Sequence, residues 1–210
     1  MKLYQKIAMF MTCMCLMGVA NAAGPAHVHR GEAVSRSGLL VKPDVVRAPQ
    51  MQVFCGTIAQ VEGDRVLVKA EDGNSVEVLY DRSTYIVDGA SGKLRLPLAL
   101  QAGQKVVAYH SARMTRSLPP QAQGYALVLG AQEEYLPKFM VADQVEQGDG
   151  FVKVLSANHD IIVTVTPEAC AAYGEIKAGD KLLVWSKMMT MIIPAYTNGE
   201  KVVVFPYDEG

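Results

Sequence analysis

LQAGQKVV at residues 100–107 and IKAGDKLL at residues 176–183 are two versions of one pattern. In each, an apolar residue leads into a glycine turn, and an apolar run that is typical of a strand follows the turn. Gly103 and Gly179 occupy the same place in the two versions. Similarity that recurs at a fixed interval indicates that one structural unit occurs twice. The chain is therefore expected to contain two tandem modules of the same fold.

Short runs rich in β-branched residues, separated by turn residues, lie on both sides of these stretches. Turn signals at residues 71–74 and 157–160 predict a hairpin in each module. One helical turn is expected within residues 94–100. We predict strands at residues 56–61, 65–69, 76–80, 105–109 and 125–129, and again at 151–155, 161–165, 181–185 and 201–205.

These runs predict an all-β protein built from two small barrel-like modules, because a closed barrel leaves few exposed strand edges. We place the modules at residues 51–132 and 133–210. Residues 1–22 combine a basic start, an apolar run and Ala20-Asn21-Ala22, which is the pattern of a secretory signal peptide rather than a membrane span. Residues 23–50 are expected to be a flexible linker. We therefore expect export to the periplasm, the cell envelope or the medium.

Charge and composition argue against several classes of function. The formal net charge is −1, and it becomes −3 once Lys2 and Lys6 leave with the signal peptide, so nucleic-acid binding is not expected. The four histidines lack carboxylate and nucleophile partners in a recognisable order, and the chain has no glycine-rich phosphate loop. We expect no enzymatic activity, cofactor or metal. Cys55 and Cys170 are either a disulfide between the modules or two unrelated buried thiols.

The same two strands of each module are joined by a segment with a threonine and, four residues later, a proline. The segments are MTRSLPPQ at residues 114–121 and MTMIIPAY at residues 189–196. The step from Met114 to Met189 is one position shorter than the step from Gly103 to Gly179, so the second module has lost one residue near Ser186. A length change there is tolerated, because loops accept insertions and deletions better than strands do.

A serine protease binds its substrate as an extended strand, with one side chain in a specificity pocket. Arg116 suits the carboxylate-ended pocket of trypsin-like enzymes. Met191 suits the apolar pockets of chymotrypsin-, elastase- or subtilisin-like enzymes. A hydroxyl at Thr115 or Thr190 can form hydrogen bonds across the loop, to the backbone or to Ser117. A proline three residues after the pocket residue limits the entropy lost on docking.

The first segment resembles the trypsin-reactive loop of the Bowman–Birk inhibitors of plants. The resemblance rests on Met114, Thr115, Arg116, Ser117, Leu118, Pro119, Pro120 and Gln121, and a shorter version recurs as Met189, Thr190, Met191, Ile192, Ile193 and Pro194. It implies that the chain inhibits serine proteases in a substrate-like way, with Arg116–Ser117 and Met191–Ile192 as the scissile bonds.

Two further expectations follow from the resemblance. It implies a cis peptide bond before Pro119. It also shows a departure, because Met114 and Ala122 stand where the plant proteins have the two cysteines that close the loop. The β scaffold must then supply the rigidity of a disulfide. The overall fold is not that of the plant family, so the similarity is one of the loops alone.

Other interpretations remain open at this stage. The two segments can be an ordinary polyproline-like surface loop and a core-facing strand. The protein can also be a structural or binding module of the cell envelope. Soft thioether ligands at Met188, Met189 and Met191, together with His110, suggest copper binding as a third candidate.

Overall fold

A computed structural model describes residues 46–131 and 135–205. The predicted signal peptide and most of the predicted linker, residues 1–45, lie outside the described residues. Residues 46–50, the end of the predicted linker, have no regular secondary structure. The described residues belong to one compact unit. Within the described residues, no helix is long and apolar enough to cross a membrane.

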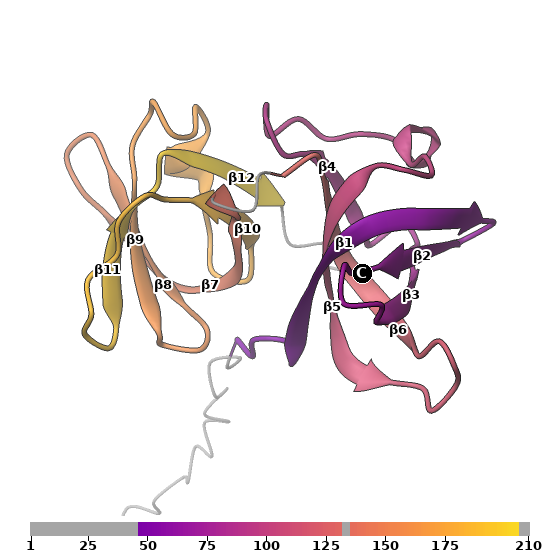
Figure 1. Cartoon of the computed structure of the whole chain (residues 1–210). Coiled ribbons are helices and arrows are strands. Elements are labelled where there is room, and N and C mark those ends of the chain that lie inside the picture. The colour runs from indigo at the N-terminus through magenta and orange to yellow at the C-terminus, as the bar shows by residue number, and fades with distance from the viewer. Residues whose placement is uncertain (1–45, 132–134, 206–210) are drawn as a thin grey trace, which may run out of the picture. The chain divides into compact units, whose positions relative to one another are not determined.

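The fold is all-β, as predicted, and its strands form two sheets (Figure 1). The structure has 3-10 turns at Pro97–Ala99, inside the predicted helical turn, and at Tyr173–Glu175. The first sheet contains β1 (Met51–Glu62), β2 (Arg65–Lys69), β3 (Ser75–Leu79), β4 (Tyr85–Asp88), β5 (Lys105–Met114) and β6 (Gln121–Leu129). The second sheet contains β7 (Lys138–Gln147), β8 (Val152–Ser156), β9 (Ile161–Val165), β10 (Lys181–Trp185), β11 (Ala195–Asn198) and β12 (Lys201–Phe205).

The first sheet closes on itself. Its strand order is β3-β2-β1-β5-β6-β4, and a further pairing joins β3 to β6. That pairing is parallel, whereas the hairpin partners are antiparallel. Five strands therefore form a ring, which is the architecture of a small Greek-key barrel such as the OB-fold.

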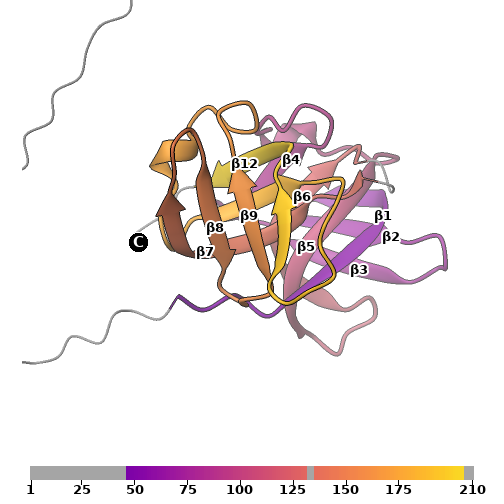
Figure 2. The ribbon, with the colours of Figure 1, turned by 90° about the vertical axis from the view of Figure 1, so that its left-hand side faces the viewer.

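The second sheet follows the same plan, with its last strand divided in two. Its order is β11-β9-β8-β7-β10-β12, and β11 lies parallel to β9 (Figure 2). Because β11 and β12 are consecutive in the chain, they bring the two ends of the sheet together. In the first module one longer strand, β6, forms both of the corresponding pairings.

Two local details confirm that the modules repeat one structure. The register between the first two strands shifts after Ile58 in the first module and after Ala142 in the second. The glycine turns meet these same strands, because Gly103 N donates to Ile58 O and Gly179 N donates to Ala142 O, both at 2.8 Å. Both glycines have a positive φ, which a side chain would disfavour.

Alternating burial explains why these sequences form barrels. In β2 and β3, the residues Val66, Val68, Val76 and Val78 point inward and are buried, while their neighbours are half-buried or exposed. Each barrel has its own apolar cluster in this way. A third cluster draws residues from both sheets, including Tyr109 of β5, Phe139 of β7 and Trp185 of β10. Trp185, which leads into the second candidate loop, is a core residue at 1% exposed.

A disulfide between Cys55 and Cys170, one of the two expected arrangements, is not formed, and both residues are thiols. Cys55 lies on β1 with an exposed side chain, whereas Cys170 packs against the core of the second barrel. The sequence could not distinguish the two arrangements, because pairing depends on which strand faces each cysteine. The structure shows two separate thiols, but the expectation that both are buried is wrong, because Cys55 is exposed and Cys170 is only half-buried.

Candidate functional site

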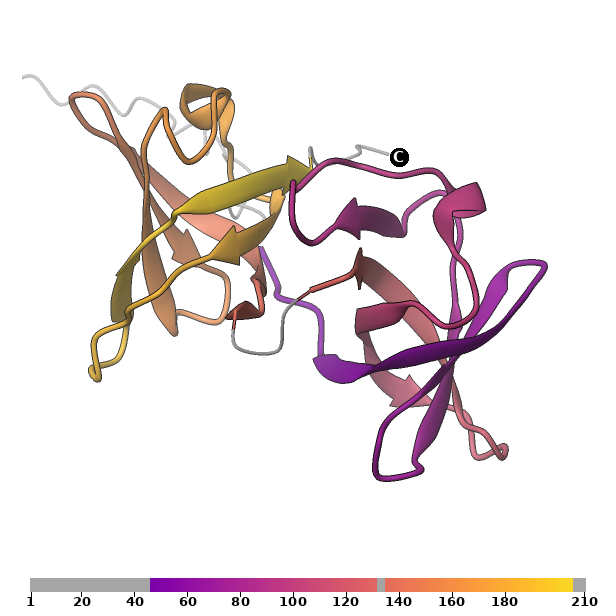
Figure 3. The ribbon, with the colours of Figure 1, turned by 45° about the horizontal axis from the view of Figure 1, so that its top comes forward.

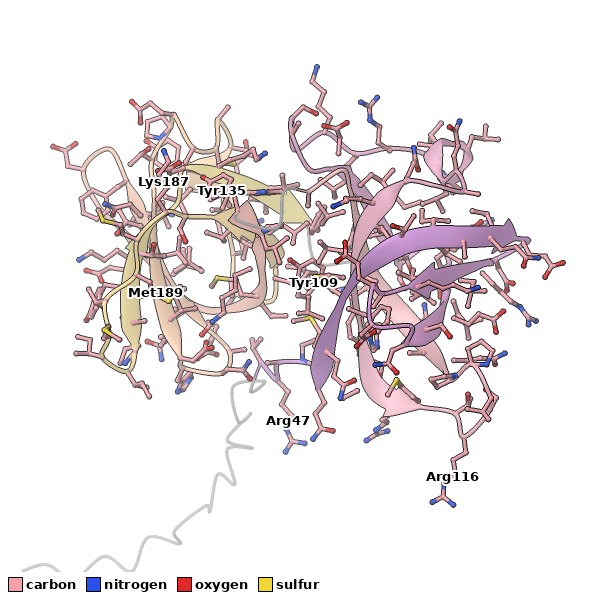
Figure 4. All side chains as sticks on the ribbon, viewed as in Figure 1. Arg47, Tyr109, Arg116, Tyr135, Lys187 and Met189 are labelled. Atoms are coloured by element: carbon pink, nitrogen blue, oxygen red, sulfur yellow. The ribbon has the colours of Figure 1, made fainter. Side chains whose placement is uncertain are left out.

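Both candidate segments are exposed loops at the end of a barrel. The first joins β5 to β6, and the second joins β10 to β11 (lower right and lower left in Figure 3). Arg116 is exposed, and its side chain points away from the ribbon (Figure 4). Met191 is fully exposed, at 103% of its reference area. The alternative that the second loop is a core-facing strand is therefore wrong.

Strand pairing holds the base of each loop. Met114 and Ala122, the residues that replace the two cysteines of the plant loop, are partners in the antiparallel pairing of β5 with β6. Met189 and Thr197 occupy the corresponding positions of the second loop, and they form an isolated antiparallel bridge. An antiparallel residue pair therefore closes the base of both loops, and we call this pair together with the hydrogen bonds across the loop the loop frame. In the second loop, the Thr197 hydroxyl also donates to Met188 O.

The threonines form the hydrogen bonds that were expected of them. Thr115 N donates to Gln121 O at 2.9 Å, and Gln121 N donates to Thr115 Oγ1 at 2.8 Å. In the second loop, Thr190 N donates to Tyr196 O at 3.0 Å, and Tyr196 N donates to Thr190 Oγ1 at 2.7 Å. Each threonine thus closes a ring across its loop, with the pocket residue inside the ring.

Ser117 forms a second layer of hydrogen bonds inside the first loop, in addition to those of Thr115. Its Oγ donates to Pro119 O at 2.7 Å and lies 2.7 Å from Thr115 Oγ1. Because the single hydroxyl proton of Ser117 is used on Pro119, Thr115 is the donor in the second contact. A chain of donors then runs from Gln121 N through Thr115 and Ser117 to Pro119 O. The hydrogen bonds in such a chain polarise one another, so each bond strengthens the next.

The second loop lacks this layer, because Ile192 stands where the first loop has Ser117. Ile192 and Ile193 are exposed, at 58% and 88%, and present an apolar surface beside Met191. The Leu118–Pro119 peptide bond is cis, as the resemblance implied, and so is the Ile193–Pro194 bond. The two loops therefore share a backbone frame and differ in the side chains that they present.

Residues far from the loops in sequence also hold them, and the sequence analysis missed these residues. Glu77 of β3 contacts the end of the first loop through its backbone and its side chain. Asp160, in the turn before β9, accepts from Ala195 N at 2.8 Å through its main-chain oxygen. No local pattern indicates either contact, because both depend on the parallel pairing that closes each barrel.

The side chain of Asp160 is itself held in place. Its carboxylate accepts hydrogen bonds from Lys138 Nζ at 2.7 Å and from Ser156 Oγ at 2.6 Å. Burial alone would raise the pKa of this carboxyl, but the bonds from Lys138 and Ser156 lower it overall. The charged form is therefore the favoured one, and it fixes the turn on which Ala195 rests.

The four residues of the copper alternative lie in different surroundings. His110 of β5 is buried, at 1% exposed, and its Nδ1 lies 2.9 Å from Ser111 O. Met188, Met189 and Met191 are exposed on the second loop, at 84%, 45% and 103%. Within residues 46–131 and 135–205, no group of three or more His, Cys, Asp or Glu side chains is arranged to hold a metal ion.

No family model and no curated protein sequence matches this chain. The fold defines it as a protein of two tandem β barrels. Each barrel has one exposed loop, and the two loops are held by the same pattern of hydrogen bonds and strand pairing.

Proposed function

We propose that the protein is an exported, double-headed inhibitor of serine proteases. Arg116 is the anchor for trypsin-like enzymes, and Met191 is the anchor for elastase-, chymotrypsin- or subtilisin-like enzymes. One observation carries the proposal: in both loops, hydrogen bonds join the threonine before the pocket residue to the strand after it, while the pocket residue projects into solvent. A substrate-like inhibitor needs this combination of a held backbone and a free anchor.

The reaction at the first loop follows from its position in a protease. The catalytic serine Oγ attacks the carbonyl carbon of Arg116, and the bond to Ser117 N breaks. The serine proton passes through the protease histidine to the new amine of Ser117. In the reverse direction, the amine attacks the acyl-enzyme ester and the peptide bond forms again. An amine that is held in place attacks the ester faster than water does.

Three hydrogen bonds cross the scissile position and can retain the amine. They join Thr115 N to Gln121 O, Gln121 N to Thr115 Oγ1, and Thr115 Oγ1 to Ser117 Oγ. In each, one partner stays with the acyl group and the other with the amine. Pairing of Met114 with Ala122 adds a further link outside this ring. The two ends of a cut loop would therefore stay together without a disulfide.

At the second loop, Met191 would occupy an apolar pocket. A long, flexible thioether side chain fills such pockets well. Two threonine hydrogen bonds and the bond from Thr197 to Met188 O cross the Met191–Ile192 position. Since Ile192 cannot continue the hydroxyl chain that Ser117 forms, we expect this head to be cleaved faster than the first.

Inhibition assays against trypsin, chymotrypsin, elastase and subtilisin test the proposal. We expect Arg116→Ala to raise the inhibition constant for trypsin by at least about 1,000-fold, since a buried arginine anchor often accounts for several kcal/mol of binding. Inhibition through the second loop should remain. Met191→Asp should show the opposite pattern, because a carboxylate is costly in an apolar pocket.

Arg113→Ala is the matched control for the first loop, because Arg113 is an exposed arginine on β5, the strand that leads into the loop, and lies before Met114. We expect it to leave trypsin inhibition within about threefold of wild type, as for most peripheral residues of an interface. A wild-type protein that leaves trypsin fully active at large molar excess would refute the first assignment. Rapid digestion of both loops would refute the mechanism.

A further inference from the structure

The strand that follows the first loop rests on β3, where Glu77 meets it twice. Glu77 N donates to Pro120 O at 2.9 Å, and Gln121 Nε2 donates to Glu77 Oε2 at 2.6 Å. The two residues Glu77 and Gln121 are direct partners in the parallel pairing of β3 with β6. Glu77 therefore holds two consecutive residues of the loop end, one by its backbone and one by its carboxylate.

The surroundings of the Glu77 carboxylate favour a strong hydrogen bond with Gln121. Its side chain is 19% exposed, so water competes only partly for its oxygens. Arg65 Nη1 lies 4.0 Å from Glu77 Oε1, on the neighbouring strand β2, and supplies an opposite charge. A hydrogen bond to an ionised acceptor is shorter and stronger than one between neutral groups. This contact is thus among the firmest that the loop end makes.

We propose that Glu77 is a positioning residue of the first head, which keeps the Ser117–Gln121 side of a cut loop seated on the barrel and so slows release of the cleaved inhibitor. The inference rests on the proposed function, since it concerns the same scissile bond. Thr115 links the two sides of that bond to each other, whereas Glu77 links the amine side to the scaffold.

The second module provides a natural comparison. Ile162 of β9 and Tyr196 of β11 occupy the corresponding paired positions, so no carboxylate holds that loop end. That loop end is held instead by the main-chain oxygen of Asp160, which accepts from Ala195 N, and by Thr197, which donates to Met188 O. A change at Glu77 should therefore affect the trypsin head and leave the second head as it was.

The test compares Glu77→Ala, Glu77→Gln and Gln121→Ala with wild type. Each variant is mixed with trypsin, and two quantities are measured: the association rate, and the rate at which the Arg116–Ser117 bond is permanently hydrolysed, followed by mass spectrometry. We expect Glu77→Ala and Gln121→Ala each to hydrolyse about tenfold faster or more, with the association rate unchanged, because a hydrogen bond to a charged group is lost. The Glu77→Gln side chain keeps an acceptor oxygen, so it should restore most of the resistance.

The double variant Glu77→Ala/Gln121→Ala should hydrolyse no faster than either single variant, since both remove one interaction. Glu62→Ala, which removes a carboxylate at the end of β1, is the control and should behave as wild type. Wild-type hydrolysis rates in Glu77→Ala, additive effects in the double variant, or loss of the second head's activity in Glu77→Ala would each overturn the inference. Failure of the wild-type protein to inhibit trypsin would instead overturn the proposed function beneath it.

Discussion

At the residue scale, the two loops have the same backbone hydrogen bonds and differ in a few side chains. Arg116 and Met191 are both exposed and both follow a threonine whose hydroxyl accepts a backbone hydrogen bond. The residue after each differs more, because Ser117 forms two polar contacts within the loop and Ile192 is an exposed apolar side chain. Under the proposed function, these side chains would choose the protease, while the hydrogen bonds of the threonine hold the shape of the loop.

Exposure makes the sulfur of Met191 a target for hydrogen peroxide, which transfers one oxygen to the thioether and leaves water. We expect peroxide to oxidise Met191 well before Met140, which is only 4% exposed in the second barrel. The sulfoxide is polar, so inhibition through the second head should fall sharply, while trypsin inhibition is retained. Peptide mapping by mass spectrometry and the two inhibition assays measure these outcomes.

Met191→Leu is the control for this prediction, since leucine has a similar size and no sulfur. It should inhibit through the second head both before and after peroxide. If peroxide abolishes inhibition in Met191→Leu as well, the loss arises at another residue.

At the element scale, the pairing of β5 with β6 defines the first loop. The strands meet again at Met114 and Ala122 after a register shift that follows His110, so the paired strands begin and end the loop. Ala122 is buried, at 2% exposed, and belongs to the core of the first barrel. The loop is thus attached directly to the packed interior, which limits how far its ends can move.

Paired residues of an antiparallel ladder have Cα atoms about 4.5–5.5 Å apart, which is within the range of a disulfide. We therefore expect Met114→Cys/Ala122→Cys to form a bridge, and the oxidised variant to resist hydrolysis at Arg116–Ser117 longer than wild type. The free energy of unfolding should rise by about 2–3 kcal/mol on the chain-entropy model for so short a loop. Urea unfolding with and without reductant measures the change.

Peptide mapping is needed to show that the new cysteines pair with each other rather than with Cys55 or Cys170. The reduced form of the same variant is the control, because it carries both substitutions without the bond. A bridge that forms but destabilises the protein would show that the two strands are set at a different spacing or angle.

At the scale of the whole molecule, several carboxylates have lowered pKa values in the folded state. For Asp81, the main cause is a hydrogen bond from the Ser83 hydroxyl. For Asp88, hydrogen bonds from Ser91 and Arg95 lower the pKa. The pKa of Asp160 is lowered by its hydrogen bonds from Lys138 and Ser156, which outweigh the opposite effect of burial. Asp81 lies just before a turn, Asp160 lies in the turn before β9, and Asp88 is the last residue of β4, so each carboxylate lies in or beside a turn.

A carboxyl with a lower pKa in the folded than in the unfolded state stabilises the fold above its unfolded pKa of about 4. That contribution is lost as the pH falls through the folded value. We expect the urea midpoint to be constant from about pH 7 to 5 and to fall progressively below about pH 4. Asp88→Asn should lower the midpoint at pH 7 and flatten its dependence below pH 4.

The exposed Asp149 serves as a control, since Asp149→Asn should follow the wild-type curve. A midpoint that rises as the pH falls from 5 to 3 would contradict the sign of the pKa shifts. So would an Asp88→Asn variant whose midpoint depends on pH as steeply as that of wild type.

Local sequence was enough to predict most strands and both loops, because alternating apolar residues and turn residues act within a few positions. It missed three strands. β7 carries Asp143 and Gln144 at its centre and is interrupted by a bulge, β11 reads Ala-Tyr-Thr-Asn, and β4 has only four residues. Each of these strands is stabilised by a neighbour distant in sequence, so its own residues give little signal.

By itself, the sequence determined the tandem repeat, the all-β class and the position of the two loops. Only the tertiary structure decided that β3 closes onto β6, that Glu77 meets Gln121, and that Cys55 and Cys170 do not pair. The physical reason is the distance along the chain over which each interaction acts. Strand alternation and turn geometry are set by neighbouring residues, whereas the choice of strand partner depends on how the whole barrel buries its apolar faces.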